Sequence, residues 1–285
     1  MILAVHPPQA GEPKAKPAEL DALALRACAL RDQARYGEAE RLLRHVLALA
    51  EEGCQGCEWR VCSFENELGM LYKYTGRFDE AEQAYHRALA IADRAGGSRG
   101  SEMLANLYHN LGGLEHARDR YAAGEPFARR GLAIRERLLG PDHPDVAADL
   151  AALAPLLDGQ GKRQEAAALM IRALGILERA YGPDNCELAV SLNNLAALRY
   201  REGNRNEALA LYRHALAIKE KCLGPVHPDV ATTLNNMAVL LKAQGDRHAA
   251  ASLYRRALVI FEQSLGEAHP KTVACRENYA RVAGR

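Results

Sequence analysis

A 42-residue repeat is the feature that most constrains the fold of this chain. The connector LGPDHPDV at 139–146 returns at 181–188, at 223–230 and, in shortened form, at 265–270. Each copy starts 42 residues after the one before it. Regular self-similarity at such a period indicates an array of stacked units, each of which buries its apolar face against its neighbours. The repeat therefore predicts an extended array and argues against one closed core.

A second element keeps the same period. A turn glycine is followed five residues later by Ala, and seven residues beyond that by Ala-Leu-x-Ile. The copies begin at Gly76, Gly161, Gly203 and Gly245, while Ala34 and Asp119 take the equivalent places in two weaker units. Six such copies predict six helix pairs, and the remaining residues near 270–283 predict a closing helix with Val273, Tyr279 and Val282 against the last pair.

Apolar residues on both sides of Gly203 recur at helical spacing, which indicates two amphipathic helices joined by a turn. The apolar positions are Leu192, Leu195, Ala196 and Leu198 before the turn, and Ala208, Tyr212, Ala215, Leu216 and Ile218 after it. Glycine tolerates the positive φ that ends a helix. Pro144, Pro228 and Pro270 in the connectors suit a first helical position. The histidines before them recur with the repeat, so we expect them to serve the turn rather than catalysis.

These motifs resemble the tetratricopeptide repeat. The residues that carry the resemblance are Leu68-Gly69-x-x-Tyr72, Gly76, Ala81-x3-Tyr85 and Ala88-Leu89. The 42-residue period, the connector, and the strings Asn193-Asn194-Leu195-Ala196 and Asn235-Asn236-Met237-Ala238 are similar to the long repeats of kinesin light chains and their bacterial relatives. The resemblance implies an all-α, right-handed α-solenoid over about residues 20–285. We expect one domain over 18–285, preceded by a disordered leader at 1–17.

The resemblance also implies a concave groove lined by the first helix of each pair, with side chains thirteen, ten and three residues before the turn glycine. The peptide-binding residues that it predicts are Asn66, Lys73, Asn106, His109, Asn193, Tyr200, Asn235 and Lys242. A carboxamide has a donor end and an acceptor end, so it can pair with the backbone of an extended peptide. The two lysines would attract acidic side chains or a carboxylate.

A structural role for the same asparagines stays open, because an amide at a fixed repeat position can instead bond a neighbouring helix. Asn194 and Asn236, one residue further on, point about 100° away and are better candidates for such interhelical bonds. Chaperone-binding tetratricopeptide domains carry an asparagine six residues before the turn glycine. This chain has Met70, Ala197 and Val239 there, which argues against a carboxylate clamp of that type.

The central units depart from the pattern between residues 112 and 157. Asp119 replaces the turn glycine, and Gly112-Gly113 is expected to loosen one helix. Pro126 and Pro155 fall inside helical stretches, where an interior proline costs roughly 3 kcal/mol. We therefore expect a kink or a late helix start there. The region is either a hinge or a tolerated degenerate repeat.

The cysteines offer the one spacing that could suit a metal. Cys54, Cys57 and Cys62 lie together, but no fourth ligand follows at a suitable interval. The seven cysteines, an odd number, are expected to be reduced thiols of a cytoplasmic protein. No phosphate-binding, nucleophile-elbow or zinc-protease motif is present, so we expect no catalytic residue, no cofactor and no metal.

Composition excludes other classes of function. Ala and Leu make up about a third of the chain, which favours helices, and no run approaches the roughly 18 apolar residues of a membrane span. The net charge of +1 leaves no overall field to recruit nucleic acid or a membrane.

The favoured function is a non-enzymatic adaptor that binds a peptide segment of a partner protein. The alternatives are a scaffold that self-associates through the solenoid ends, and a metal- or redox-dependent regulator that uses the cysteine cluster.

Overall fold

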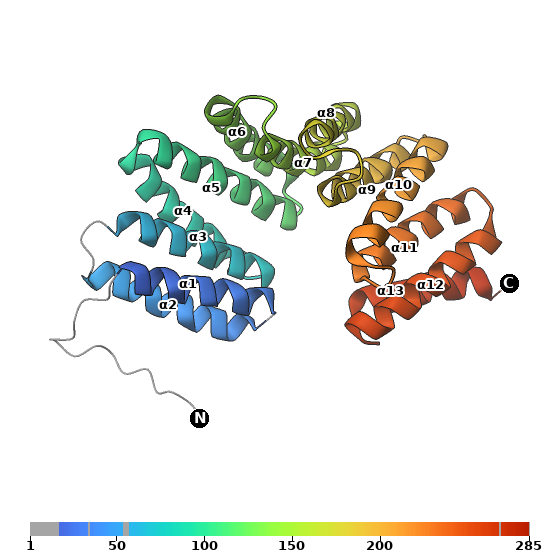
Figure 1. The fold of residues 1–285 in the computed structure, drawn as a ribbon, viewed down its shortest axis with the longest axis horizontal. Coiled ribbons are helices and arrows are strands. Elements are labelled where there is room, and N and C mark those ends of the chain that lie inside the picture. The colour runs from blue at the N-terminus through green and yellow to red at the C-terminus, as the bar shows by residue number, and fades with distance from the viewer. Residues whose placement is uncertain (1–16, 34, 54–56, 268, 285) are drawn as a thin grey trace. The chain divides into compact units, whose positions relative to one another are not determined.

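The structure is a computed structural model that describes residues 17–33, 35–53, 57–267 and 269–284. Over these residues it contains thirteen α-helices, which confirms the all-α fold of helix pairs closed by a last helix (Figure 1). The helices are α1 (Pro17–Asp32), α2 (Tyr36–Gly53), α3 (Glu58–Tyr74), α4 (Phe78–Ala95), α5 (Gly97–Ala117), α6 (Tyr121–Leu139), α7 (Pro144–Gly159), α8 (Arg163–Tyr181), α9 (Cys186–Arg201), α10 (Arg205–Leu223), α11 (Pro228–Ala243), α12 (Arg247–Leu265) and α13 (Pro270–Ala283).

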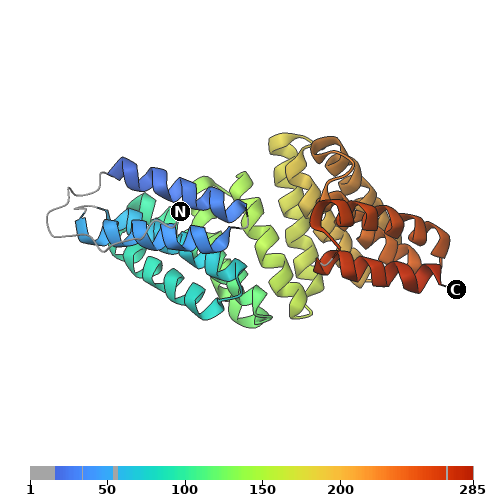
Figure 2. The same cartoon turned by 90° about the horizontal axis from the view of Figure 1, so that it is seen from below.

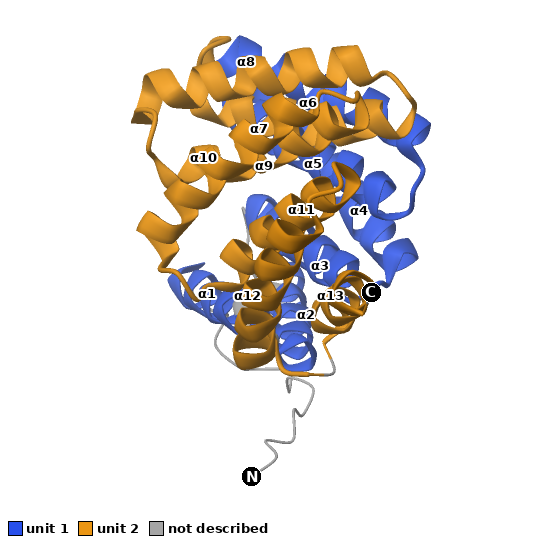
Figure 3. Cartoon of the chain, turned by 90° about the vertical axis from the view of Figure 1, so that its right-hand side faces the viewer, with its two compact units in different colours: residues 1–138 blue, residues 139–285 orange. Residues whose placement is uncertain are grey.

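The helices fall into two compact units, residues 1–138 and 139–285 (Figure 3). The first unit holds the pairs α1–α2, α3–α4 and α5–α6, and the second holds α7–α8, α9–α10, α11–α12 and the closing helix α13 (Figure 2). The boundary lies inside the irregular stretch at 112–157. Of the predicted leader, only Pro17 is described, and it is the first residue of α1.

The turns inside the pairs have the backbone conformation that the glycine pattern predicts. The four turn glycines have positive φ, for example +89° at Gly203 and +90° at Gly245. Asp119 adopts the same region with a φ of +56°. An L-residue is disfavoured there because its β-carbon crowds the backbone. The third helix pair, α5–α6, thus makes the same turn without a glycine.

The connectors between pairs confirm the predicted role of the histidines. His143, His227 and His269 are N-caps, and the Nδ1 atom of each accepts a hydrogen bond from the backbone N–H two residues later, at 3.1–3.2 Å. The prolines that follow occupy the first helical position, where the missing N–H costs nothing. At α9 the cap is Asn185, whose Oδ1 accepts from the backbone N–H of Glu187 at 2.9 Å.

The closing helix covers the last pair with a narrower face than the sequence predicts. Cys275 and Val282 of α13 are buried in one cluster with Ala250, Tyr254 and other side chains of α11 and α12, and Tyr279 packs against its edge. Val273, however, is 40% exposed, so its predicted packing role is wrong. It lies on the outer side of the helix, two residues before the buried Cys275.

Helices α5 and α6, in the stretch where the sequence departs from the repeat pattern, are more regular than the sequence predicts. Helix α6 begins at Tyr121, directly after the turn, and runs through Pro126, so the helix does not start late. Nor does Gly112 loosen α5. A β-carbon there would stand 3.1 Å from the β-carbon of Ala128, so the glycine allows α5 and α6 to pack closely. Gly131 does the same from the other side, because its β-carbon would meet the backbone oxygen of Ala105 at 3.1 Å.

None of the helices in the described ranges is long and apolar enough to cross a membrane.

Candidate peptide-binding surface

In the first unit, the amide of Asn66 is tied to the next pair. Its Oδ1 accepts a hydrogen bond of 2.8 Å from Nδ2 of Asn110, which lies one residue after His109 on α5. Asn66 is half-buried on α3. The bond therefore links the first helices of two successive pairs, as the structural alternative expects. It uses only the oxygen of the Asn66 amide, and its NH₂ group remains for a partner.

The side-chain amide of Asn106 on α5 has the same orientation as that of Asn66. Its Oδ1 accepts a hydrogen bond of 2.9 Å from the guanidinium of Arg135 on α6. Arg135 is buried, with 8% of its surface exposed. Here too the oxygen faces inward, toward the second helix of the pair. His109, between Asn106 and Asn110, is half-buried on the same helix.

Lys73 is the fourth predicted peptide-binding residue of the first unit. Its Nζ lies 3.5 Å from the position that a β-carbon on Gly113 would take, so the side chain extends from α3 over α5. Desolvation lowers the pKa of Lys73. The absence of a side chain on Gly113 leaves room for this cation. The first unit thus brings Asn66, Lys73, Asn106 and His109 onto two neighbouring first helices.

In the second unit, Asn193 belongs to a buried polar chain. Its Oδ1 lies 3.3 Å from the hydroxyl of Thr233 on α11, and Thr233 accepts a hydrogen bond of 3.0 Å from Nζ of Lys219 on α10. Lys219 and Thr233 are both buried, with exposures of 7% and 0%. Desolvation lowers the pKa of Lys219. The chain connects three successive helices and fixes the oxygen end of the Asn193 amide.

Asn235 holds the equivalent position one repeat later but lacks the equivalent partner. Its Oδ1 is buried and accepts no hydrogen bond. The residue that corresponds to Thr233 is Cys275, 40 residues further along, just as Thr233 follows Asn193 by 40 residues. The thiol of Cys275 points instead to the backbone oxygen of Tyr254, at 3.7 Å. The loss of one hydroxyl therefore explains the unpaired oxygen.

Tyr200 and Lys242 complete the predicted set in the second unit. Both are half-buried near the ends of α9 and α11. Tyr200 packs against a cluster that contains Ala196, Tyr212 and Leu240, so its ring also serves the core. Each unit therefore carries its own four predicted residues on first helices.

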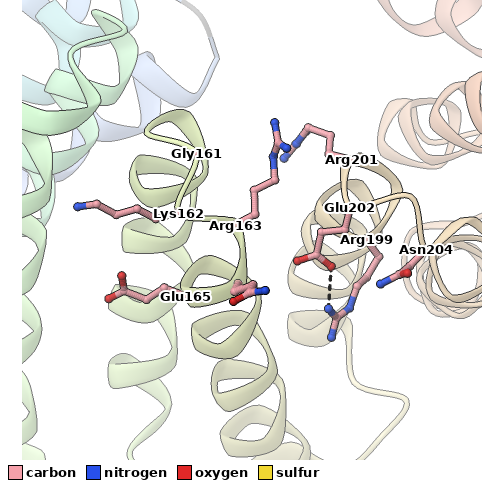
Figure 4. Close-up of a pocket in the computed structure, with 9 residues that line it drawn as sticks. Gly161, Lys162, Arg163, Glu165, Arg199, Arg201, Glu202 and Asn204 are labelled. Carbon is pink, nitrogen blue, oxygen red and sulfur yellow. Dashed lines mark hydrogen bonds and ion pairs between the residues drawn. The ribbon is translucent and has the colours of Figure 1, made fainter.

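The structure adds a charged pocket that the sequence did not reveal. It lies in the second unit, between the turn of α7–α8 and the turn of α9–α10, and has a volume of about 800 Å³ (Figure 4). Two arginines that line it, Arg163 and Arg201, pair with Asp158, and a third, Arg199, pairs with Glu202 and Glu207. Asp158 lies three residues before Gly161, a predicted groove position. These basic side chains already hold carboxylates of the chain, so we assign the pocket no ligand.

The cysteines require a correction. Cys186 and Cys222 form a disulfide, and Cys57 is also disulfide-bonded, so the prediction of reduced thiols is wrong for them. The repeat itself brings Cys186 and Cys222 together, because the first residue of α9 lies beside the last turn of its antiparallel partner α10. Cys28, Cys62 and Cys275 are thiols that form no disulfide, and burial raises the pKa of Cys62 to about 11.

The predicted metal cluster includes Cys54, which lies outside the described residues. Among the residues that the structure describes, no group of three or more potential ligands could hold a metal ion. Cys62 lies in the core of the first unit, where its thiol donates to the backbone oxygen of Ala88 at 3.3 Å.

Successive helix pairs joined by glycine turns define a helical-repeat protein. Models of the tetratricopeptide repeat match residues 103–179, 159–221, 187–263 and 229–285, and a second model of this repeat matches 20–54 and 66–95. The chain belongs to the tetratricopeptide repeat family. No curated protein matches it.

Several solved structures share the fold. BtubC (BKLC) from P. vanneervenii is 24% identical, with a TM-score of 0.64 over 88% of this chain and 94% of that chain. A point variant of a kinesin-light-chain-like Podosopora anserina protein with nearly identical TPR-like repeats is also 24% identical, with a TM-score of 0.60 over 74% of this chain and 99% of its own. The tetratricopeptide sensor protein of the STAND class from Pyrococcus horikoshii has a TM-score of 0.71 at 15% identity, over 94% of this chain and 39% of its own.

Proposed function

We propose that the chain is a non-enzymatic adaptor that binds a segment of a partner protein along the first-helix faces of its repeats. Tetratricopeptide domains generally mediate protein–protein interaction, and the family match supports that coarse function. The finer proposal concerns the residues and the chemistry of the bound segment.

The finer proposal rests on one observation: four asparagine amides share the same orientation, with the oxygen directed toward the protein. Asn66, Asn106 and Asn193 each accept a hydrogen bond through Oδ1. Asn235 turns its Oδ1 into the interior. At all four positions the NH₂ group is the end of the amide left for a ligand, and Lys73 and Lys242 add further donors. Within each unit, such a set of donors favours a segment that brings acceptors, namely backbone carbonyl groups and the carboxylates of acidic side chains.

This arrangement also reconciles the two roles that the sequence leaves open for the asparagines. The same amide bonds its neighbour through the oxygen and offers its nitrogen to a partner. The internal bond fixes the side-chain rotamer, so less conformational entropy is lost when a peptide binds.

The test is a selection of random displayed peptides against the intact protein, followed by affinity measurements on the peptides that it enriches. The double variant Asn193→Ala/Asn235→Ala should lose at least about ten-fold in affinity, because each lost donor to a charged acceptor contributes about 1.5 kcal/mol or more. The matched control is Asn206→Ala, an exposed asparagine of α10 outside the predicted surface.

The helical circular dichroism signal and the melting temperature should be nearly unchanged in the double variant. If the selected peptides bind the double variant as tightly as they bind the native protein, the proposed second-unit site is wrong. An unfolded double variant would show that the asparagines are structural.

A further inference from the structure

The Cys186–Cys222 disulfide joins the two ends of one helix pair at the surface. Cys186 is the first residue of α9, and Cys222 lies in the last turn of α10. Their Cα atoms are 6.1 Å apart, and 36 residues separate them in the sequence. Both residues are exposed. Soluble thiols can therefore reach the two sulfur atoms without any opening of the core.

The repeat shows what this disulfide replaces. Cys186 occupies the connector position that Pro144, Pro228 and Pro270 occupy in the other connectors of the second unit. Those prolines are the first residues of α7, α11 and α13, where the pyrrolidine ring fixes φ at a helical value. Helix α9 alone among these four begins without a proline. A covalent bond to the end of the neighbouring helix restrains its start instead.

The surroundings of the pair suit reversible exchange. A thiolate on Cys186 would lie at the N-terminus of α9, where the helix dipole stabilises a negative charge. The residue before Cys222 is Lys221, whose ammonium group pairs with Asp184 of the connector at 3.4 Å. The helix dipole favours departure of Cys186 as the thiolate when another thiolate attacks the disulfide, whereas the charge of Lys221 is offset by Asp184.

We propose that Cys186–Cys222 is a redox-controlled modification site that holds the first turn of α9 when oxidised and releases it when reduced. The co-reactant is a dithiol. One of its thiolates attacks a sulfur of the pair and the other cysteine leaves as a thiolate. The second thiol of the reductant then displaces the first cysteine. The dithiol loses two electrons and two protons and becomes a disulfide, while Cys186 and Cys222 become thiols.

We expect the reduced protein to differ from the oxidised protein only near the start of α9. Asn185 can still cap α9, and the buried Leu188 and Leu192 still anchor the helix, so reduction should loosen its first turn without unfolding the pair. Val190 and Asn193 follow one and two turns later on the same side as Cys186. Reduction should loosen the first turn of α9 whether or not this face binds a peptide.

Amide hydrogen exchange, followed by mass spectrometry on the intact protein with and without a dithiol reductant, tests the proposal. Backbone N–H groups of Leu188 and Val230 donate to the cap carbonyls of their helices, at 3.1 Å and 3.0 Å, so the first turns of α9 and α11 form a matched pair. Reduction should speed exchange at 188–190 by about ten-fold or more and leave 230–232 unchanged, because only the first segment loses a restraint.

The double variant Cys186→Pro/Cys222→Ser is the control. It copies the residues of the next pair, Pro228 and Ser264, and it retains Cys57, so any response to reduction elsewhere in the chain is preserved. Exchange at 188–190 in this variant should be slow in both conditions. The proposal is overturned if reduction leaves exchange at 188–190 of the native protein unchanged, or if the reduced pair does not re-form when an oxidised dithiol is added.

Discussion

Gly69 of α3 lies directly against the ring of Tyr85 of α4. A β-carbon on Gly69 would overlap Cε1 of that ring, since it would lie closer than any non-bonded carbon contact allows. Tyr85 is fully buried, and burial raises its pKa. The helices of this pair can therefore pack at their observed distance only because residue 69 has no side chain.

Replacement of Gly69 by alanine should lower the free energy of unfolding by about 1–3 kcal/mol, because the added methyl group forces the ring or the helix to move. Gly175 of α8 is the matched control. Its β-carbon would meet only the flexible end of Arg179, at 3.4 Å, so Gly175→Ala should raise stability by up to about 1 kcal/mol through helix propensity. Chemical denaturation measures both changes. Equal effects of the two variants would contradict the packing argument.

Asp119 occupies a turn position that favours glycine. Its φ is +56°, and nothing in its place in the repeat distinguishes it from Gly161 or Gly203. Asp119→Gly should stabilise the protein by about 0.5–1 kcal/mol, because glycine adopts this region without the steric cost. The change removes an exposed hydrogen bond from the hydroxyl of Tyr121, whose net contribution is small.

The reverse change, Gly203→Asp, should cost a similar amount, since a β-carbon at Gly203 meets nothing within 4 Å and only the backbone conformation is strained. Thermal melting of the two variants checks the pair. A destabilised Asp119→Gly variant would show that the aspartate side chain stabilises the turn by more than its backbone costs.

The unpaired oxygen of Asn235 can be supplied with a donor. Cys275→Thr places a hydroxyl where Thr233 stands in the preceding repeat, and that hydroxyl lies 3.3 Å from Oδ1 of Asn193. We expect a gain of about 1 kcal/mol in the free energy of unfolding. Cys275→Ala, which removes the sulfur and adds no donor, should be destabilising. If threonine and alanine have the same effect, the hydroxyl is not what this position lacks.

Lys219 makes stability depend on pH in the alkaline range. Burial lowers its pKa in the folded state below the ordinary value of 10.5, so the unfolded state binds the proton more tightly. Stability should therefore rise as pH increases toward 10.5, because the cost of the buried charge disappears.

Lys219→Leu should remove that rise and increase stability near pH 7 by about 1 kcal/mol. Leucine is the residue at the same repeat position of α8, Leu177, and it is buried there. The hydroxyl proton of Thr233 has two acceptors within reach, the backbone oxygen of Asp229 at 3.2 Å and Oδ1 of Asn193 at 3.3 Å, so the hydroxyl does not depend on Lys219 for a partner. Urea denaturation at several pH values measures the difference. A variant whose stability rises with pH as much as that of the native protein would exclude Lys219 as the cause.

The repeat period predicted the fold because every unit copies the same local signals. A glycine in the turn, a proline at the helix start and small residues at the packing positions each specify one backbone feature, and the period places them in register. The irregular centre was predicted less well. In the sequence, Pro126 and Gly112 resemble two isolated defects, whereas in the structure Gly112 makes room for Ala128 of the helix that contains Pro126.

The candidate surface could be predicted as a set of positions but not as a set of hydrogen bonds. The spacing gives the face on which Asn66 and Asn193 lie. It does not show that Asn110 and Thr233 hold their oxygens, because those partners come from the next repeat at offsets of 44 and 40 residues. An odd cysteine count does not predict a disulfide, and the sequence alone does not show that Cys186 and Cys222, 36 residues apart, meet where α9 begins and α10 ends.

Site-specific photo-crosslinking tests the central claim most directly. A photoreactive residue at Val190, which is 60% exposed on the predicted peptide-binding face of α9, is compared with one at Ile171, which is 49% exposed on α8, a second helix. With a labelled peptide from the selection described above, we predict a crosslink from position 190 and none from position 171. A crosslink from position 171 alone would contradict the assignment of binding to the first-helix faces.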